Sequence, residues 1–270
     1  MERSPVVAGH FYPAQPDALR ALVDEYMRGD PGQEAAKAVA LVVPHAGYVY
    51  SGRTAGKTYG SVQVPGRVVL LGPNHTGRGR PAALWAKGGW RTPLGRVPVD
   101  ERFAAALLGK TPGLETDQRA HLEEHSLEVQ LPFLQRRAPG LRIVPICLAD
   151  LGLERLVALG ESLGAVIQAH APGETLVVIS SDMTHYESRE AARQKDRLAL
   201  ERMEALDGPG LYATVRENSI SMCGVVPAVV GCIAAVRLGA VRGRLCDYSC
   251  SGDVTGDVRQ VVAYAGLTCT

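Results

Sequence analysis

The sequence predicts a single-domain α/β fold in which helices flank a mixed central β-sheet. Short apolar runs alternate with stretches of helical periodicity along the 270 residues, which is typical of a layered α/β sheet. The last two apolar runs are joined through a Gly/Asp turn at residues 251–253, which favours an antiparallel edge. Because we find neither an internal repeat nor a Ser/Gly linker, residues 1–270 are expected to form one domain.

Six apolar runs are expected to form strands. The first stops at Pro44, the second at Gly72-Pro73 and the fourth at a Ser-Ser-Asp sequence, so residues that favour turns end each of them. The third is interrupted by Pro145. The expected strands are residues 38–43, 67–71, 141–148, 175–179, 244–249 and 258–267.

Six further segments have the spacing of helices. Asp17 is a candidate cap for the first, and Pro132 must kink the third or shift its start. The fifth is long and highly charged, which indicates an exposed face, whereas the sixth is apolar on nearly all sides and is expected to be buried. The expected helices are residues 17–27, 53–60, 124–137, 153–169, 187–206 and 224–238.

Composition and charge argue against several classes of partner. The net charge is +1 and the arginines are scattered, so we expect neither a nucleic acid nor an acidic membrane as partner. The N-terminal residues have no apolar region of a signal peptide, and no run approaches the about 18 apolar residues of a membrane span. We therefore expect a cytoplasmic protein. The six cysteines form no C-x-x-C pair, so most are expected to be buried free thiols rather than a disulfide framework.

Three expected strands end in sequences that contain histidine. His45 follows the first, His75 the second and His185 the fourth. In layered α/β folds, ligands bind beyond the carboxyl ends of strands, so neighbouring strands would place three imidazoles along one rim. A single histidine after a strand is more often a turn residue. The shared location and the Gly, Pro and Asn neighbours, which allow close backbone approach, favour a joint site.

Cys223 lies at the start of the apolar helix expected at residues 224–238. The positive end of the helix dipole lowers the pKa of a thiol there and favours the thiolate, which is the form that binds metals and acts as a nucleophile. A cysteine packed under the helix explains the same position equally well. Physical reasoning on the sequence leaves these two alternatives open.

Residues 121–128 are dense in ionisable groups. His121 and His125 are spaced as in H-E-x-x-H, but no Glu follows His121 directly, so a metalloprotease is not expected. The plain alternative is a solvated helix start with glutamates near the positive end of the dipole. Glu124 and His125 remain candidates for a pocket wall. Residues 8–13 are too stiff for a tail and are expected to pack against the body.

Six motifs together make the sequence similar to the Memo family, which includes protein B of the bacterial and archaeal AmmeMemoRadiSam system. They occur in the order that the family has and span nearly the whole chain, so the set is far more specific than any one motif. The motifs are Ala8-Gly-His-Phe-Tyr-Pro13, Pro44-His-Ala-Gly-Tyr48, Gly72-Pro-Asn-His75, Glu124-His-Ser-Leu-Glu-Val-Gln-Leu-Pro132, Ser180-Ser-Asp-Met-Thr-His185 and Cys223-Gly.

The Memo family resembles class III extradiol dioxygenases in fold, and those enzymes hold Fe(II) with two His and one carboxylate. The resemblance implies that His45 and His75 are metal ligands and that His185 is the catalytic acid or base. For a metal-dependent enzyme we expect Asp182 to orient His185. Cys223 stands where the dioxygenases have their third ligand, a Glu. A thiolate is softer and oxidisable, which argues against ring cleavage and allows Cu or Zn besides the expected Fe. The wall of this pocket is expected to include Tyr48, Asn74, Glu124 and His125.

Two classes of function follow from the resemblance. The first is a metal-dependent oxidoreductase or oxygenase-like enzyme. The second is a peptide- or protein-binding adaptor that uses the old cleft, since animal members are described as signalling adaptors in cell motility. The name of the system also implies Ammecr-like and radical-SAM partner proteins, acting on a small molecule or macromolecule. Cys246 and Cys250 have the first spacing of a radical-SAM motif, but residue 253 is Asp, so radical chemistry is not expected in this chain.

Overall fold

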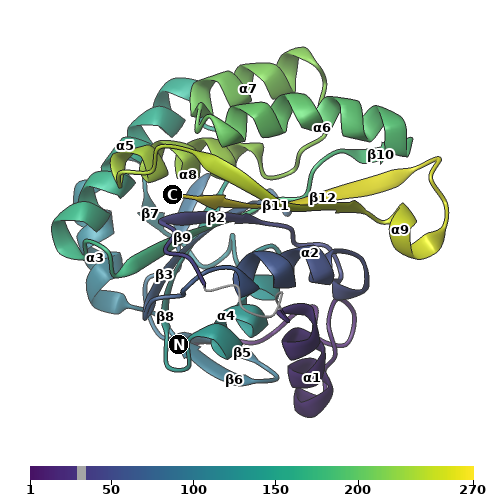
Figure 1. Ribbon diagram of the computed structural model, residues 1–270. Helices are drawn as coiled ribbons and strands as arrows, with labels where there is room; N and C mark the ends of the chain where they lie inside the picture. Colours follow the sequence, from purple (N-terminus) through teal and green to yellow (C-terminus); the bar gives the residue numbers. More distant parts are fainter. Residues whose placement is uncertain (29–34) are drawn as a thin grey trace.

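A nine-stranded mixed sheet forms the middle layer of the computed structural model, which describes residues 1–28 and 35–270 (Figure 1). Its centre is parallel, in the order β2, β9, β3, β8. The bounds of these strands are Ala40–Val43, Thr175–Ser180, Arg67–Pro73 and Arg142–Leu148. Strand β12 (Val261–Cys269) pairs antiparallel with β2, so the predicted mixed α/β sheet is confirmed.

Shorter strands complete both edges of this sheet. Beside β12 lie β11 (Gly243–Cys250) and β10 (His185–Glu187), both antiparallel to it. Beyond β8 lie β4 (Ala82–Leu84), which is antiparallel to β8, and β7 (Glu115–Thr116). A separate three-stranded sheet contains β1 (Glu2–Arg3), β5 (Gly89–Thr92) and β6 (Gly95–Pro98).

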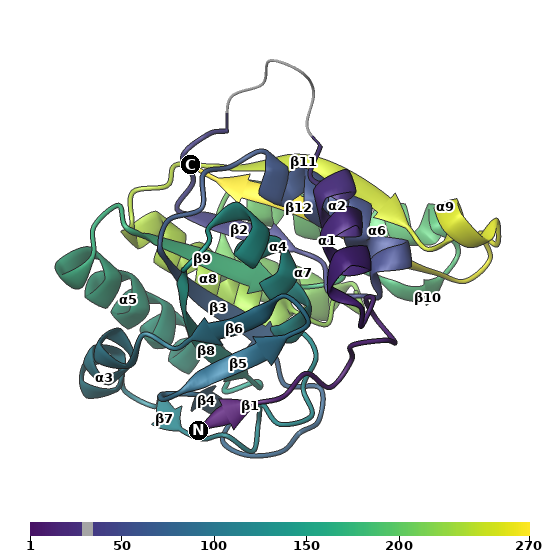
Figure 2. The same ribbon diagram turned by 90° about the horizontal axis from the view of Figure 1, so that it is seen from below.

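Helices cover both faces of the large sheet (Figure 1). One face carries α3, α5, α6, α7 and α8, with the bounds Glu101–Lys110, Leu153–His170, Arg189–Glu204, Gly208–Glu217 and Val225–Arg237. The other face carries α1 (Pro16–Tyr26), α2 (Tyr48–Gly60), the 3-10 turn η1 (Glu128–Gln130) and α4 (Leu131–Arg137), and the small sheet lies beside them (Figure 2). The short α9 (Gly252–Thr255) joins β11 to β12.

Because both faces are covered, the central strands are apolar on both sides rather than alternating. Val69 and Leu71 of β3 face the core under α5 and α8, whereas Val68 and Leu70 face the core under α2 and α4. All four are fully buried. This double burial explains why continuous apolar runs, and not alternating ones, marked these strands in the sequence.

All six expected strands are present, with ends that differ by a few residues, and Pro145 does not interrupt β8. Four details of the prediction were wrong. Asp17 lies in the first turn of α1 and not at its cap, α2 begins five residues before the expected residue 53, and residues 251–253 enter a short helix. The expected helix 124–137 begins only at η1, and residues 124–127 form turns that present Glu124 and His125.

Two further predictions concern the cysteines and membrane-spanning helices. All six cysteines are free, as expected. Among residues 1–28 and 35–270, every helix is too short or too polar to span a bilayer.

Candidate metal centre

The carboxyl ends of three neighbouring strands build the candidate centre. Strand β9 pairs with β2 on one side and with β3 on the other, all in the same direction, so the three ends meet at one edge. His45 follows β2 after Pro44, His75 follows β3 and His185 lies five residues beyond β9. The condition for a shared rim, that these strands be neighbours, is therefore met.

Cys223 also lies at this edge of the sheet, in the segment just before α8. Its neighbour Gly224 is the N-cap of α8 and lies directly against the end of β9. A Cβ atom at Gly224 would lie 2.4 Å from the Cβ of Ser181 and 2.5 Å from the carbonyl oxygen of Ser180. Only glycine allows this approach, which brings the thiol to the histidines.

The ligand atoms of His45, His75 and Cys223 all lie within 4.8 Å of one another. The Nε2 atom of His45 is 3.2 Å from the Sγ atom of Cys223, and the ring centres of His45 and His75 are 5.1 Å apart. A second group within the same limit contains Asp182, His185 and again Cys223. The structure thus brings together all five residues that the sequence assigned to the metal and to proton transfer.

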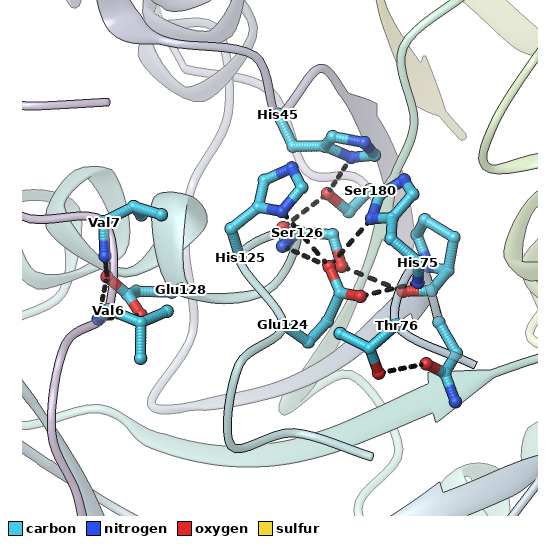
Figure 3. A network of polar contacts seen from close by, with 12 residues as sticks. Val6, Val7, His45, His75, Thr76, Glu124, His125, Ser126, Glu128 and Ser180 are labelled. Carbon is cyan, nitrogen blue, oxygen red and sulfur yellow. Dashed lines mark hydrogen bonds and ion pairs between the residues drawn. The ribbon is translucent and has the colours of Figure 1, made fainter. Parts of the chain in front are cut away.

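The tautomer of His45 follows from the contacts of Ser180. The Ser180 hydroxyl has one proton and donates it to the carbonyl of Ser126 at 2.7 Å, and it accepts a hydrogen bond from the Gln130 amide at 2.9 Å. The Nδ1 atom of His45, 2.9 Å from the same oxygen, must therefore carry a proton and donate it. This leaves a lone pair on Nε2, on the side of Cys223. Figure 3 shows the contact between His45 and Ser180.

Glu124 orients His75 in the same way (Figure 3). Its two carboxylate oxygens accept from the Nδ1–H of His75 at 2.9 Å and from the backbone amide of His75 at 2.6 Å. Burial raises the pKa of Glu124, but the hydrogen bond from His75 and the amide of Ser126 outweigh burial and lower it to about 2. An ionised Glu124 can only accept, so the neutral ring of His75 carries its proton on Nδ1 and keeps the lone pair on Nε2. A carboxylate behind a ligating histidine is a recurrent feature of metal sites.

His185 is oriented by carbonyl groups. Its Nδ1 lies 2.8 Å from the carbonyl oxygen of Met183 and 2.9 Å from that of Ser221, so the neutral ring carries its proton on Nδ1 and Nε2 is again free. Asp182, which was expected to orient this ring, instead accepts from the backbone amides of His45 and Ala46 at 2.7 and 3.3 Å. Its carboxylate therefore shapes the loop that carries His45.

Burial shifts the pKa values of three groups of the centre. It lowers the pKa of His45 well below its usual value, raises that of the Cys223 thiol well above its usual value and raises that of Asp182 to about 6. The expectation that the helix dipole lowers the pKa of Cys223 was wrong, because desolvation of the buried thiol outweighs the dipole. A neutral imidazole and a thiol that ionises only beside a cation fit a metal centre, since binding would release the thiol proton.

Of the expected wall residues, His125 and Glu124 lie at the centre. The His125 ring stacks on His75 at 4.8 Å between ring centres and meets His45 edge-on at 5.5 Å. Tyr48 belongs to the core behind the site, where its hydroxyl donates to the carbonyl of Val129. Asn74 holds its own loop through Arg78 and Thr76.

The sequence reasoning missed three residues of the site. Ser180 and Gln130 fix the His45 ring, and Phe11 packs edge-on against His125 at 4.9 Å between ring centres. All three lie inside the family motifs quoted above, so position within a motif was the signal that could have indicated them.

Residues 3–268 match the family model described as Memo-like protein. The chain belongs to the Memo family. It is 47% identical to a MEMO1 family protein of Aquifex aeolicus, with 98% of each chain covered, and 43% identical to one of Methanopyrus kandleri, with 99% of this chain and 98% of the other covered. An uncharacterized protein of Escherichia coli K12 has a similar fold, with a TM-score of 0.53 at 13% identity, covering 84% of this chain and 98% of that one.

Proposed function

We propose that this Memo-family chain binds a transition metal through Nε2 of His45, Nε2 of His75 and Sγ of Cys223, and that the centre supports a redox or oxygenase-like reaction. One observation carries the proposal. Protein oxygens accept hydrogen bonds from Nδ1 of both His45 and His75, which leaves both Nε2 lone pairs beside a half-buried thiol. A packed, non-functional cluster has no need for such matched orientation.

The donor set fits iron, and also copper or zinc. Imidazole suits all three metals, and a thiolate shifts preference toward softer ones. Iron is the first expectation, by likeness to a two-histidine, one-carboxylate site. A bound iron or copper ion would supply one-electron redox chemistry and Lewis acidity.

The remaining side chains have roles that the geometry supports. His185 has a free Nε2 and shares a 4.8 Å cluster with Cys223, so it can take or give a proton at the centre. Asp182, with a pKa raised to about 6, lies 4.0 Å from His45 and adds a second proton-carrying group. The His125 ring stacks on one side of His75, and Phe11 packs edge-on against His125.

Metal analysis of paired double variants tests this proposal. The protein is purified without chelator, and metal per chain is measured for wild type, for H75A/C223A and for H170A/C246A. The control removes one histidine and one cysteine that lie outside the centre. We expect wild type and control to hold the same metal and H75A/C223A to lose most of it. Equal metal content in all three proteins would refute the proposal.

A second candidate function is a peptide- or protein-binding adaptor, and Tyr186 is the observation that favours it. This side chain is 73% exposed, directly follows His185 and has a left-handed backbone with φ of 61°. Exposed aromatic side chains recur at recognition surfaces. Peptides selected on metal-free protein should lose binding in Y186A and keep it in V241A, which removes another exposed apolar side chain. Equal binding to both variants would exclude Tyr186 as the contact.

A further inference from the structure

Arg3 is buried although it lies near the start of the chain. Its side chain is 1% exposed, and its guanidinium lies 4.2 Å from the centre of the Trp90 ring. Nη1 donates to a carboxylate oxygen of Glu128 at 2.7 Å, and this carboxylate is fully buried as well. Such a buried pair is costly to desolvate, and apolar side chains of similar size often stabilise a protein equally well. The pair therefore calls for an explanation other than stability.

The other two guanidinium nitrogens bind the turns that carry Glu124 and His125. Nε donates to the carbonyl of His121 at 2.7 Å, and Nη2 donates to the carbonyl of Glu124 at 2.5 Å. One planar side chain thus holds residues 121–128 at three points, namely two carbonyls and the Glu128 carboxylate. The rigid fork of arginine suits this task, whereas the single ammonium of lysine does not.

Glu128 fixes the same turns to the N-terminal segment, residues 2–12. Its carboxylate accepts from the backbone amides of Val6 and Val7 at 2.9–3.0 Å (Figure 3). It also accepts from the Tyr12 hydroxyl at 2.7 Å. Within that segment, Phe11 packs against His125. The N-terminal segment is therefore part of the wall of the centre, and Arg3 joins this segment to the turns of residues 121–128.

We infer that Arg3 is a positioning residue, which acts through Glu124 to hold His75 with its Nε2 lone pair toward Cys223. The inference rests on the proposed function for its purpose, but its structural content does not depend on a metal. If Arg3 is removed, the carbonyl of Glu124 loses a charged donor and the turn can shift. A shifted carboxylate no longer fixes the Nδ1 proton of His75.

The chain offers a matched control in Arg67. This arginine also pairs with a buried carboxylate, Asp100, at 2.7 Å and also lies over an aromatic ring, Phe103, at 4.7 Å. It is at the start of β3, the opposite end of that strand from His75. R67M therefore removes the same kind of interaction without touching the turns of residues 121–128.

The test measures the tautomer of His75 by ¹⁵N NMR in metal-free wild type, R3M, R3K and R67M at one pH, with urea unfolding of each. We expect the Nδ1–H form in wild type and R67M, and a mixture of tautomers in R3M and R3K, whatever their stabilities. R3K keeps the positive charge but lacks the three-point fork of arginine. It can therefore replace R3M in the test if R3M does not fold. An unchanged tautomer in the folded arginine variants, or an equal change in R67M, would overturn the inference.

A metal titration of the same proteins separates this inference from the proposed function. Loss of an outer hydrogen-bond partner typically lowers metal affinity about 10–100-fold, and we expect R3M and R3K, but not R67M, to show such a loss. A wild-type protein that takes up no metal would contradict the proposed function alone. The tautomer measurement would still decide the role of Arg3.

Discussion

The Nε2 atom of His45 lies 3.2 Å from the Sγ atom of Cys223, although 178 positions separate the two residues in the sequence. The opposite nitrogen of the ring donates to Ser180. His45 is thus held between a fixed acceptor and a thiol, and it is 2% exposed. This arrangement is the basis of the predictions that follow.

Removal of the Ser180 hydroxyl should weaken metal binding. S180A removes the acceptor for the Nδ1 proton of His45 and leaves the amide of Gln130 without this partner. We expect metal affinity to fall about 10–100-fold and the free energy of unfolding to fall by about 1–3 kcal/mol. Titration against a competing chelator and urea unfolding measure the two effects. S61A is the control, because that hydroxyl donates to the Thr58 carbonyl of α2 and otherwise contacts only the Cys246 thiol, outside the centre, so S61A should retain wild-type affinity.

Replacement of the thiol by a carboxylate should restore the ligand set of a dioxygenase. C223D supplies two imidazoles and one carboxylate, the facial arrangement typical of non-haem Fe(II). We expect C223D to retain iron and to lose the sulfur-to-metal charge-transfer absorption of the wild type, whereas C223A should lose most of its metal. Retention of that absorption in C223D would show that Cys223 is not a ligand.

The ionised carboxylate of Glu124 should stabilise the metal-free protein at neutral pH, and this stabilisation should be lost in acid. Its pKa is about 2 in the folded protein, against 4.5 for a glutamate free in water, so the folded state favours the ionised form. The stabilisation is fully present above pH 4.5 and is lost as the pH falls toward 2, and its full size is on the order of 3 kcal/mol. The difference in unfolding free energy between wild type and E124Q should therefore shrink between pH 5 and pH 2.

The neighbouring glutamate provides the control for this pH dependence. Glu123 is 61% exposed in its side chain and pairs with Arg78 at the surface. Ion pairs of this kind contribute little, so E123Q should differ little from wild type at any pH. A difference for E124Q that stays constant with pH would contradict the assignment of an ionised, buried Glu124.

Gly224 should tolerate no side chain. The Cβ of G224A would meet Ser181 and the carbonyl of Ser180 at about 2.5 Å, so α8 must move away from β9 and take Cys223 with it. Overpacking of this kind costs about 1–3 kcal/mol, and we expect a parallel loss of metal affinity. G66A is the control, since nothing lies within 4 Å of a Cβ there. Wild-type affinity in a folded G224A protein would argue against Cys223 as a ligand.

The central sheet could be predicted from the sequence because its strands are local signals. Buried apolar runs that end at proline, glycine or Ser-Ser-Asp mark β2, β3 and β9, and their parallel pairing places His45, His75 and His185 at one edge. The short strands β1, β4 and β7 have two or three residues each, so they carry too little pattern to be found. Helices α3 and α7 were also missed in the sequence.

The contacts that orient the site could not be predicted, because they join distant segments. Ser180, Gln130 and Ser126 meet at the His45 ring only after β9 and the turns before α4 have packed together. The raised pKa of Cys223 also depends on segments that are distant in the sequence. Its position before α8 is a local feature that favours a thiolate, whereas its burial, which decides the pKa, depends on the whole fold.

The X-ray absorption spectrum of the metal in protein purified without chelator is the most direct test of the proposed centre. A ligand set of His45, His75 and Cys223 predicts a first shell with one sulfur and at least two imidazole nitrogens, and the sulfur contribution should vanish in C223D. A first shell of oxygen and nitrogen alone in the wild type, or a spectrum that C223D leaves unchanged, would contradict it.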